Sequence, residues 1–420
     1  MAADAPKSDP HAPPEPRSAQ RPGRYVHDAF GPSDQPPAVP ADLAAGGYLT
    51  AQISAGAVRE NLAAIRRAIG PRTRLCAVVK SDAYGHSLRC LLPTIAAAAD
   101  WLAVTIPAEA LQLRDMGHDG PVLMFFSPCA YGDTAERART LRELVARDVT
   151  LTVVSPDEIG PVAEAARAAG REARVHIKID SGMSRSGVQC DQAGVLADAI
   201  RTVEGIRLDG LYTHFATADE PASSVPGDQL RRFREAAEAC GGPAGLTLHA
   251  ANSAATLTRP ETHLDMVRPG IAIYGYRPDA SLEFPAGIRP ALRLVGPLMQ
   301  VKRVPAGSRC GYGLTYTFKR DSRIGLVPVG YADGFGRALS NRGVMRIRGQ
   351  DVLVRGRISM DQTILDLTDT PDAAVGDEVE IISPDPSAPN SVEHIARLCG
   401  TIPYEVTCRL GGRVRRVLVE

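Results

Sequence analysis

The sequence predicts an α/β protein in which a (β/α)8 barrel of the TIM type is followed by a mostly β C-terminal domain. Short apolar runs recur between residues 75 and 268 at intervals that leave room for a helix and two loops. Segments with helical spacing lie between these runs, and alternating segments replace both after about Gly287. A doubly wound sheet is the competing interpretation of the same runs.

The first forty residues differ in composition from the rest of the chain. Ten of the 33 prolines lie there, with almost no large apolar side chains. Such a segment cannot offset its ordering entropy by burial. We therefore expect a disordered, proline-rich tail over residues 1–47.

Order is expected to begin near Tyr48. An alternating segment at 48–53 predicts a first strand, which we expect to pair with the C-terminal domain. Ser54 is a typical N-cap residue, and apolar residues recur after it at helical spacing until Gly70. The sequence thus predicts a helix between Ser54 and Gly70.

Eight apolar runs then predict the strands of the barrel. They are 75–79, 101–105, 122–125, 151–154, 175–179, 208–212, 246–250 and 266–268. Stretches between them, such as 157–169 and 228–240, have the spacing and composition of helices. We expect the barrel domain to span 48–286.

A β-rich domain is predicted over 287–420. Alternating segments separated by turns predict its strands at 292–301, 344–348, 352–355, 363–367 and 378–382. One short helix is predicted at 392–398, and Gly400 ends it.

Composition narrows the class of partner. Lysine plus arginine and aspartate plus glutamate both number 48, so no net charge favours nucleic acid or an anionic membrane. The eight cysteines form no Cys-x-x-Cys pair, which argues against a zinc site or a disulfide framework. With neither a signal pattern nor a membrane-length apolar run, we expect a cytoplasmic protein with a small-molecule partner.

Polar and glycine residues follow several predicted barrel strands, where barrel enzymes carry their chemistry. They are Lys80, Lys178, Arg185, His214, Asn252, Ser253, Arg268 and Gly270. Each alone has an ordinary structural interpretation, such as a core histidine or a salt-bridge arginine. Their shared rim favours a site, and a lysine opposite a glycine and serine cradle predicts a phosphorylated cofactor or substrate.

Five stretches of the barrel, VVKSDAYGHS, KIDSGMSRSG, YTHFATAD, HAANS and RPGIAIYG, resemble the successive motifs of bacterial alanine racemases. The resemblance continues through GYG at 311–313, GYADG at 330–334, GRISMDQ at 356–362 and TIPYEV at 401–406. It covers nearly all of 48–420. It implies an isomerase that uses pyridoxal 5'-phosphate to interconvert L-alanine and D-alanine, which supplies D-alanine for peptidoglycan.

The resemblance also implies the roles of individual residues. Lys80 would hold the cofactor as a Schiff base and serve as one catalytic base. Tyr312 would be the other base, contributed by the second subunit of a homodimer to the opposite face of the cofactor. Arg268 would face the pyridine nitrogen, and His214 would lie between Arg268 and the tyrosine.

Further binding residues are implied in the same way. The cofactor contacts are Tyr84, Asn252, Ser253, Gly270, Ile271 and Tyr404, all but Asn252 at the phosphate. The substrate carboxylate would contact the Arg185 side chain and the Met360 amide. The supporting residues are Lys178, carried as a carbamate beside Arg185, Tyr331 at the entrance, and Asp361 near the Met360 amide.

Three alternatives remain open on sequence grounds. The same two bases could serve a broad-specificity racemase acting on serine or basic amino acids. A decarboxylase can share this architecture, although Arg268 in place of a carboxylate argues against it. A non-catalytic carrier of pyridoxal phosphate is disfavoured by the long C-terminal domain, which contains Tyr312.

Overall fold

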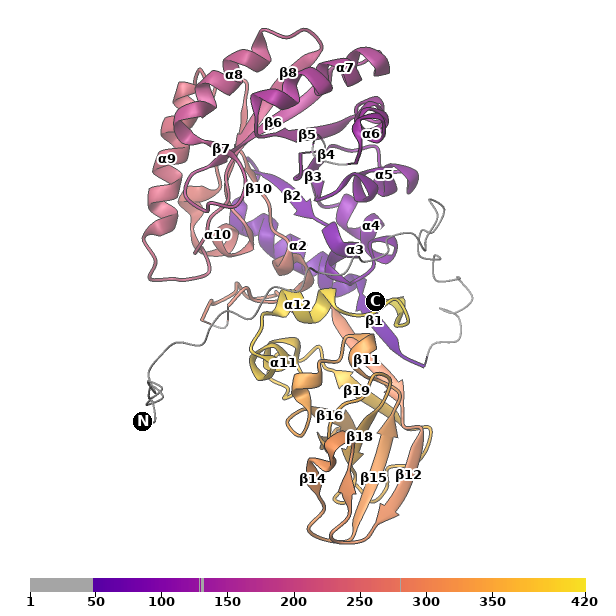
Figure 1. Cartoon of the computed structure of the whole chain (residues 1–420). Helices are drawn as coiled ribbons and strands as arrows, with labels where there is room; N and C mark the ends of the chain where they lie inside the picture. The colour runs from indigo at the N-terminus through magenta and orange to yellow at the C-terminus, as the bar shows by residue number, and fades with distance from the viewer. Residues whose placement is uncertain (1–47, 128, 130–131, 280) are drawn as a thin grey trace, which may run out of the picture. The chain divides into compact units, whose positions relative to one another are not determined.

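The computed structural model describes residues 48–127, 129, 132–279 and 281–420, and Figure 1 shows the chain coloured along its length. The predicted tail at 1–47 lies outside these residues. Within them, a closed parallel barrel is followed by a β-rich domain, which confirms the predicted fold class. No helix in these ranges is long and apolar enough to cross a bilayer.

Eight parallel strands form the barrel, and they correspond to the eight predicted runs. They are β2 (Arg74–Val78), β3 (Trp101–Val104), β4 (Val122–Met124), β5 (Val149–Val153), β6 (Ala173–Asp180), β8 (Ile206–Tyr212), β9 (Thr247–His249) and β10 (Met266–Val267). The order is β5-β4-β3-β2-β10-β9-β8-β6, and pairing of β5 with β6 closes the barrel. A two-residue strand, β7 (Val188–Gln189), adds to the end of β6.

Helices alternate with these strands around the barrel (Figure 1). They are α2 (Ala55–Ile69), α4 (Leu88–Ala96), α5 (Pro107–Asp115), α6 (Thr134–Ala146), α7 (Ile159–Ala169), α8 (Ala193–Arg201), α9 (Val225–Ala239) and α10 (Ser253–Thr258). Ser54 Oγ accepts the Ala57 amide at 3.0 Å, and Gly70 follows the last turn of α2 with a φ of 73°. Both ends of the first predicted helix are therefore confirmed.

The β-rich domain is built on a nine-stranded sheet. Its strands are β1 (Thr50–Ser54), β11 (Leu292–Pro297), β12 (Gln300–Val304), β15 (Ser322–Val327), β16 (Val344–Ile347), β17 (Gln350–Val354), β18 (Thr363–Asp366), β19 (Glu378–Ile382) and β20 (Arg415–Val419). The order is β12-β15-β18-β17-β16-β19-β11-β1-β20. β1 pairs antiparallel with β11 and parallel with β20, so the first strand of the chain belongs to this sheet.

Several short elements of this domain depart from the sequence prediction. The segment predicted as one strand at 292–301 is two, because Pro297 lacks the N–H that would continue the ladder and the chain then pairs with β15 instead of β19. A hairpin of β13 (Arg309–Cys310) and β14 (Tyr316–Thr317), strands β15 and β20, and helix α12 (Pro403–Cys408) were not predicted. The helix predicted at 392–398 is α11 (Val392–Cys399).

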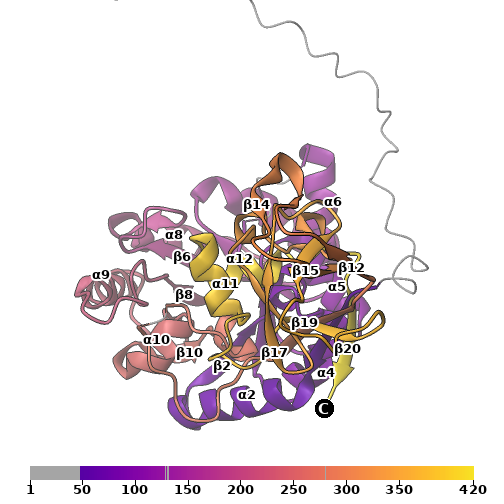
Figure 2. The same ribbon diagram turned by 90° about the horizontal axis from the view of Figure 1, so that it is seen from below.

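Contacts between the barrel and the β-rich domain position the site. One cluster of buried apolar side chains runs from Leu49 to Val414 through both. The buried Asn61 of α2 donates to the carbonyls of Ile273 and Arg289, both at 2.9 Å, and accepts the Arg289 amide at 2.8 Å. Helix α12 packs against α3 (Lys80–Tyr84) of the barrel (Figure 1). It also packs against α11, which lies beside it in both views (Figures 1 and 2). The domain after the barrel thus contacts the segment that begins with Lys80.

Candidate active site

A cavity of about 730 Å³ lies at the carboxyl ends of the barrel strands. The segments after β2, β8, β9 and β10 line it, together with β6 and its following loop and the start of α12. The predicted site residues among its lining are Lys80, Tyr84, Lys178, Arg185, His214, Asn252, Ser253, Arg268, Gly270 and Tyr404. Ile271 is fully buried next to Gly270. The cavity therefore gathers side chains from across the barrel.

The segment after β2 has an unusual backbone. Residues Ser81 to Tyr84 of α3 all have positive φ, between 53° and 56°, so α3 is a left-handed turn. This conformation costs about 1–2 kcal/mol per residue for L-amino acids. Lys80 and Tyr84 stand at the two ends of the turn, and both line the cavity.

The environment of Lys80 favours an uncharged amine. Burial lowers the pKa of Lys80, and the nearby Arg185 guanidinium lowers it further. Glu109 acts in the opposite direction, but the net pKa lies below the usual value of a lysine. The amine is therefore more available for nucleophilic and base chemistry than a solvated lysine amine.

Ser253 and Gly270 form a cradle of backbone and hydroxyl groups. Ser253 Oγ accepts the amide of Gly270 at 2.8 Å and that of Ala272 at 3.3 Å. A Cβ at position 270 would lie 2.2 Å from the hydroxyl of Tyr84, so only glycine permits this approach. The Tyr84 ring in turn packs 5.9 Å from the ring of Tyr404. Small groups and two phenols thus surround one point of the cavity.

Arg268 follows β10 and is 3% exposed. Its guanidinium donates to the carbonyls of Thr213 at 2.7 Å and Ala250 at 3.1 Å, and to His249 Nδ1 at 2.8 Å. His214 Nδ1 lies 3.5 Å from the same guanidinium. Burial lowers the pKa of Arg268 to about 10, so it remains a cation at neutral pH.

Two further histidines, in a hydrogen-bonded chain that starts at the Arg268 guanidinium, fix the position of Arg268. Because the guanidinium only donates, His249 accepts at Nδ1 and carries its proton on Nε2, which lies 2.9 Å from His176 Nδ1. Burial and the Arg268 charge hold the pKa of His249 well below its usual value, and burial lowers that of His176 to about 3. Arg268 therefore faces neutral imidazoles, and its charge is directed into the cavity.

Four basic side chains line the cavity without an ion-pair partner among the described residues, namely Lys80, Lys178, Arg185 and Arg268. Asp219 is the only carboxylate among the described lining residues. Burial, and next Arg185, lower the pKa of Lys178 to about 8. Such an excess of positive charge suits a ligand with more than one anionic group.

Of the predicted residues in the β-rich domain, Tyr404 lines this cavity and four others do not. The structure places Tyr312, Tyr331, Met360 and Asp361 elsewhere, and the first three are 72%, 44% and 52% exposed. The Tyr331 amide donates to the Ser359 carbonyl at 3.2 Å, which joins the loops of Tyr331 and Met360.

The loop of Tyr312 meets the same segment. A Cβ on Gly311 would lie 2.8 Å from the Arg357 amide, so the loop lies against residues 356–357. Arg413 pairs with Asp361 at 2.8 Å and with Asp333 at 2.9 Å, which ties the neighbouring loops together. Tyr312, Tyr331 and Met360 are thus presented by loops that share the segment 356–361.

Sequence reasoning missed several residues around the site. His176 and His249 lie inside apolar strands, and neither is among the predicted site residues. Tyr212 ends β8, stacks on His249 with ring centres 4.9 Å apart, and lies 5.2 Å from the Arg268 guanidinium. A polar residue inside a strand that is buried on both faces was the available signal.

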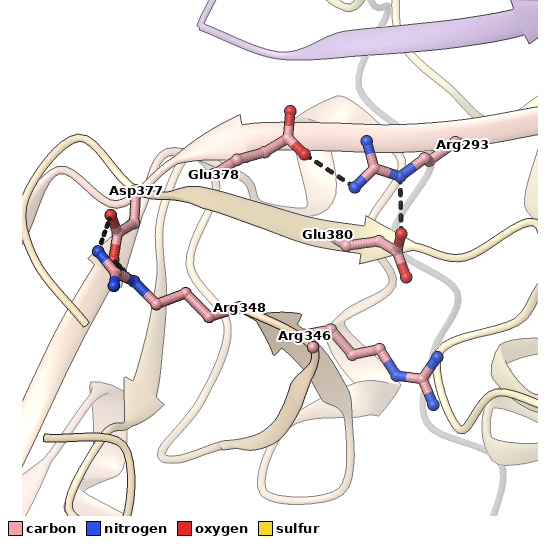
Figure 3. A pocket seen from close by; sticks show the side chains of 7 residues that line it. Arg293, Arg346, Arg348, Asp377, Glu378 and Glu380 are labelled. Atoms are coloured by element: carbon pink, nitrogen blue, oxygen red, sulfur yellow. Dashed lines mark hydrogen bonds and ion pairs between the residues drawn. The ribbon is translucent and has the colours of Figure 1, made fainter. Parts of the chain in front are cut away.

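A second hollow, of about 410 Å³, lies in the β-rich domain (Figure 3). Arg293 pairs with Glu378 and Glu380 at 2.8 and 2.7 Å, and Arg348 pairs with Asp377 at 2.8 Å (Figure 3). Because these cations are already paired with carboxylates, the hollow is a network of surface ion pairs.

Comparisons with known proteins extend over both domains. The family model described as alanine racemase, N-terminal domain, matches residues 53–278, and that of the C-terminal domain matches residues 291–418. An alanine racemase of Desulfovibrio desulfuricans is 38% identical over 374 residues, covering 88% of this chain and 98% of the relative. One of Desulfosudis oleivorans is 40% identical over 382 residues, with 87% and 95% covered.

Solved structures agree with the sequence relatives. The alanine racemase from D-cycloserine-producing Streptomyces lavendulae has a TM-score of 0.81 and 39% identity, covering 89% of this chain and 97% of that one. The enzyme from Streptomyces coelicolor A3(2) has a TM-score of 0.82 and 38% identity, with 90% and 100% covered.

Proposed function

The chain belongs to the alanine racemase family of isomerases, and on that premise we propose that it interconverts L-alanine and D-alanine with pyridoxal 5'-phosphate as its cofactor. The observation that carries the proposal is the gathering of Lys80, Arg268 and the cradle of Ser253 and Gly270 in one cavity. A phosphorylated aldehyde needs an amine, a fixed polar group for its ring and a place for its phosphate.

The residues of the cavity fit this cofactor. The glycine at 270 leaves space beside the Tyr84 hydroxyl, where a Cβ would collide. Asn252 accepts the Ala255 amide at 3.1 Å and so caps α10, which begins at Ser253. We assign the phosphate contacts to Tyr84, Ser253, Gly270, Ile271 and Tyr404.

Pyridoxal phosphate, when bound, would supply an electron sink that acidifies the α-carbon hydrogen of an amino acid. Lys80 would hold it covalently through its amine. Arg268 would face the ring nitrogen, and because a guanidinium does not give up its proton and only donates hydrogen bonds, that nitrogen would stay unprotonated. His214, whose pKa burial and Arg268 hold well below its usual value, is neutral beside it.

Racemisation needs one group to take a proton from one face of the α-carbon and another to return a proton to the opposite face. We assign these two roles to Lys80 Nζ and Tyr312 Oη. Tyr312 is 72% exposed and does not line the cavity of its own chain. This supports a homodimer in which each subunit contributes Tyr312 to the site of the other.

We assign the substrate carboxylate to the Arg185 guanidinium and to the Met360 amide of the second subunit. Tyr331, whose loop adjoins that of Met360, would narrow the entrance, and Asp361 would hold the Met360 loop through its pair with Arg413. A guanidinium binds a carboxylate with two parallel hydrogen bonds, which would fix the orientation of the amino acid.

Lys178 is proposed to carry a carbamate. With the pKa of Lys178 lowered to about 8 by burial and by Arg185, part of its amine is uncharged at neutral pH and can react with carbon dioxide. A carbamate would replace a cation repelling Arg185 by an anion that orients it. A high-resolution density map is expected to show the added carbon dioxide on Lys178, and a bare ε-amine in that map rules out the carbamate.

We further propose that the enzyme works in the cytoplasm and supplies D-alanine for peptidoglycan. The eight cysteines are all unpaired in the described structure, which is consistent with a reducing compartment.

Chiral chromatography of the products tests the function. Purified protein incubated with L-alanine or with D-alanine is expected to give the same final mixture of both enantiomers. L-serine, L-lysine and L-arginine form the comparison panel, since a broad-specificity racemase would also act on these larger amino acids. Failure to form D-alanine from L-alanine contradicts the substrate assignment, and absence of a visible cofactor absorption band contradicts the cofactor.

A further inference from the structure

The left-handed turn of α3 needs support that its own sequence does not provide. None of the four positive-φ residues, Ser81 to Tyr84, is a glycine. Non-glycine residues hold such a conformation only where the surrounding structure over-determines it. The contacts around α3 therefore show what keeps Lys80 in place.

The C-terminal side of the turn is held by two contacts within residues 81–88 and by one from Arg416 of β20. Asp82 Oδ1 accepts the Leu88 amide at 2.7 Å, and the Gly85 amide donates to the Ser81 carbonyl at 2.9 Å. Arg416 Nε donates to the Gly85 carbonyl at 3.3 Å. None of these contacts involves the Ser81 amide or the residue before Lys80.

On the N-terminal side, the Val79 carbonyl accepts the Ala83 amide and the Val79 amide donates to the Ala103 carbonyl, both at 2.9 Å. The residue after Lys80 is held by a distant carboxylate. Ser81 follows Lys80 directly, and its amide donates to Glu109 Oε1 at 2.7 Å. The other oxygen of Glu109 accepts the amides of Thr105 at 2.8 Å and Ile106 at 3.3 Å, at the start of α5. One carboxylate thus joins the loop after β3 to the first left-handed residue.

We propose that Glu109 is a positioning residue for Lys80, because it holds the Ser81 amide and so fixes the start of the turn that carries the lysine. This inference rests on the proposed function for its meaning, since Lys80 is there the cofactor lysine. An ordinary helix cap would need only the two contacts of Oε2 at the start of α5. The contact of Oε1 with another element is the feature that a cap does not require.

Glu109→Gln separates the two roles. Glutamine keeps the size of the side chain but has a single acceptor oxygen. Its NH2 group must therefore lie against a backbone N–H on one side of the bridge, where two donors meet and no hydrogen bond forms. It also removes the carboxylate that opposes burial and Arg185 at Lys80.

Glu158→Gln is the matched control. Glu158 Oε2 accepts the Val154 amide at 2.7 Å after β5, which is the same kind of contact in a neighbouring loop. Both variants replace a carboxylate that accepts a backbone amide, but glutamine at 158 keeps an acceptor for its one amide contact. Only Glu109 contacts the turn of Lys80.

The test uses the full chain freed of cofactor, so that it does not depend on catalysis. Hydrogen exchange is measured by mass spectrometry over residues 79–86, and acylation of Lys80 by acetic anhydride is followed against pH, with Lys302 and Lys319 as internal references. In Glu109→Gln we expect exchange in the turn to be roughly fivefold faster. The midpoint of Lys80 acylation should shift to lower pH, because burial and Arg185 remain while the carboxylate is lost. In Glu158→Gln, both quantities should equal those of the parent.

Equal exchange and equal midpoints in the two variants overturn the proposal and leave Glu109 as a helix cap. Should Glu109→Gln fail to fold, Glu109→Asp gives the second test, because the shorter side chain keeps the charge and the cap but cannot span to Ser81. Unchanged exchange over 79–86 in that variant also overturns the proposal. Failure of the proposed function is recognised separately, by a parent chain that shows no visible cofactor band. Exchange and acylation of the cofactor-free chain still test the role of Glu109 in that case.

Discussion

Replacing Lys80 with alanine is expected to lower the rate of alanine racemisation by about 1,000-fold or more. The lysine is assigned two tasks, covalent attachment of the cofactor and proton transfer at one face of the α-carbon. Burial and Arg185 lower the pKa of its amine, and no other lysine of the described structure except Lys178 lines the cavity. Conversion of L-alanine is measured by chiral chromatography, and cofactor attachment by visible absorption and borohydride trapping.

Lys302→Ala is the control, because Lys302 is exposed on β12 of the other domain. It should match the parent in rate, absorption and melting temperature. Methylamine added to Lys80→Ala supplies a free amine in the space left by the side chain, so partial recovery of the rate is expected from a folded variant. A Lys80→Ala protein that racemises alanine within tenfold of the parent rate contradicts the assignment.

The barrel could be predicted because its strands are buried on both faces. All four residues of β3, for example, are buried, so the strand is a continuous apolar run bounded by polar residues. The backbone around Lys80 could not be predicted in this way. The left-handed turn depends on Glu109, which lies 28 residues away from Ser81 in the chain, and on Gly85, whose Cβ would lie 2.1 Å from the Thr407 carbonyl.

The residue pattern predicts less of the β-rich domain and of its site residues. β13 and β14 have two residues each, which is too short for an alternation to be recognised. Residue types at strand ends indicated Lys80 and Arg268 as rim residues, but nothing in the pattern near Tyr312 indicates a base. Its assignment came from the resemblance, and the single chain does not test it, because Tyr312 does not line the cavity of its own chain.

Tyr312→Phe is expected to lower racemisation in both directions by about 100-fold or more, while the visible cofactor band remains. Phenylalanine keeps the ring and removes only the hydroxyl that would move the proton at the second face. Tyr316→Phe is the control, since Tyr316 lies four residues away and packs on Phe318 with ring centres 5.0 Å apart. That variant should retain the parent rate.

Mixed dimers decide whether Tyr312 serves its own chain or the partner. Lys80→Ala and Tyr312→Phe subunits are unfolded together in equal amounts and refolded. They form mixed dimers alongside the two inactive variant homodimers. If Tyr312 acts on the other subunit, each mixed dimer contains one site with both an intact lysine and an intact tyrosine. Random pairing then restores about a quarter of the activity of an equal amount of refolded parent enzyme. If Tyr312 acts within its own chain, every site lacks one of the two bases and the mixture stays as inactive as its components. Recovery therefore follows only from exchange of the tyrosine between subunits, because neither variant alone can supply both proton-transfer groups to one α-carbon.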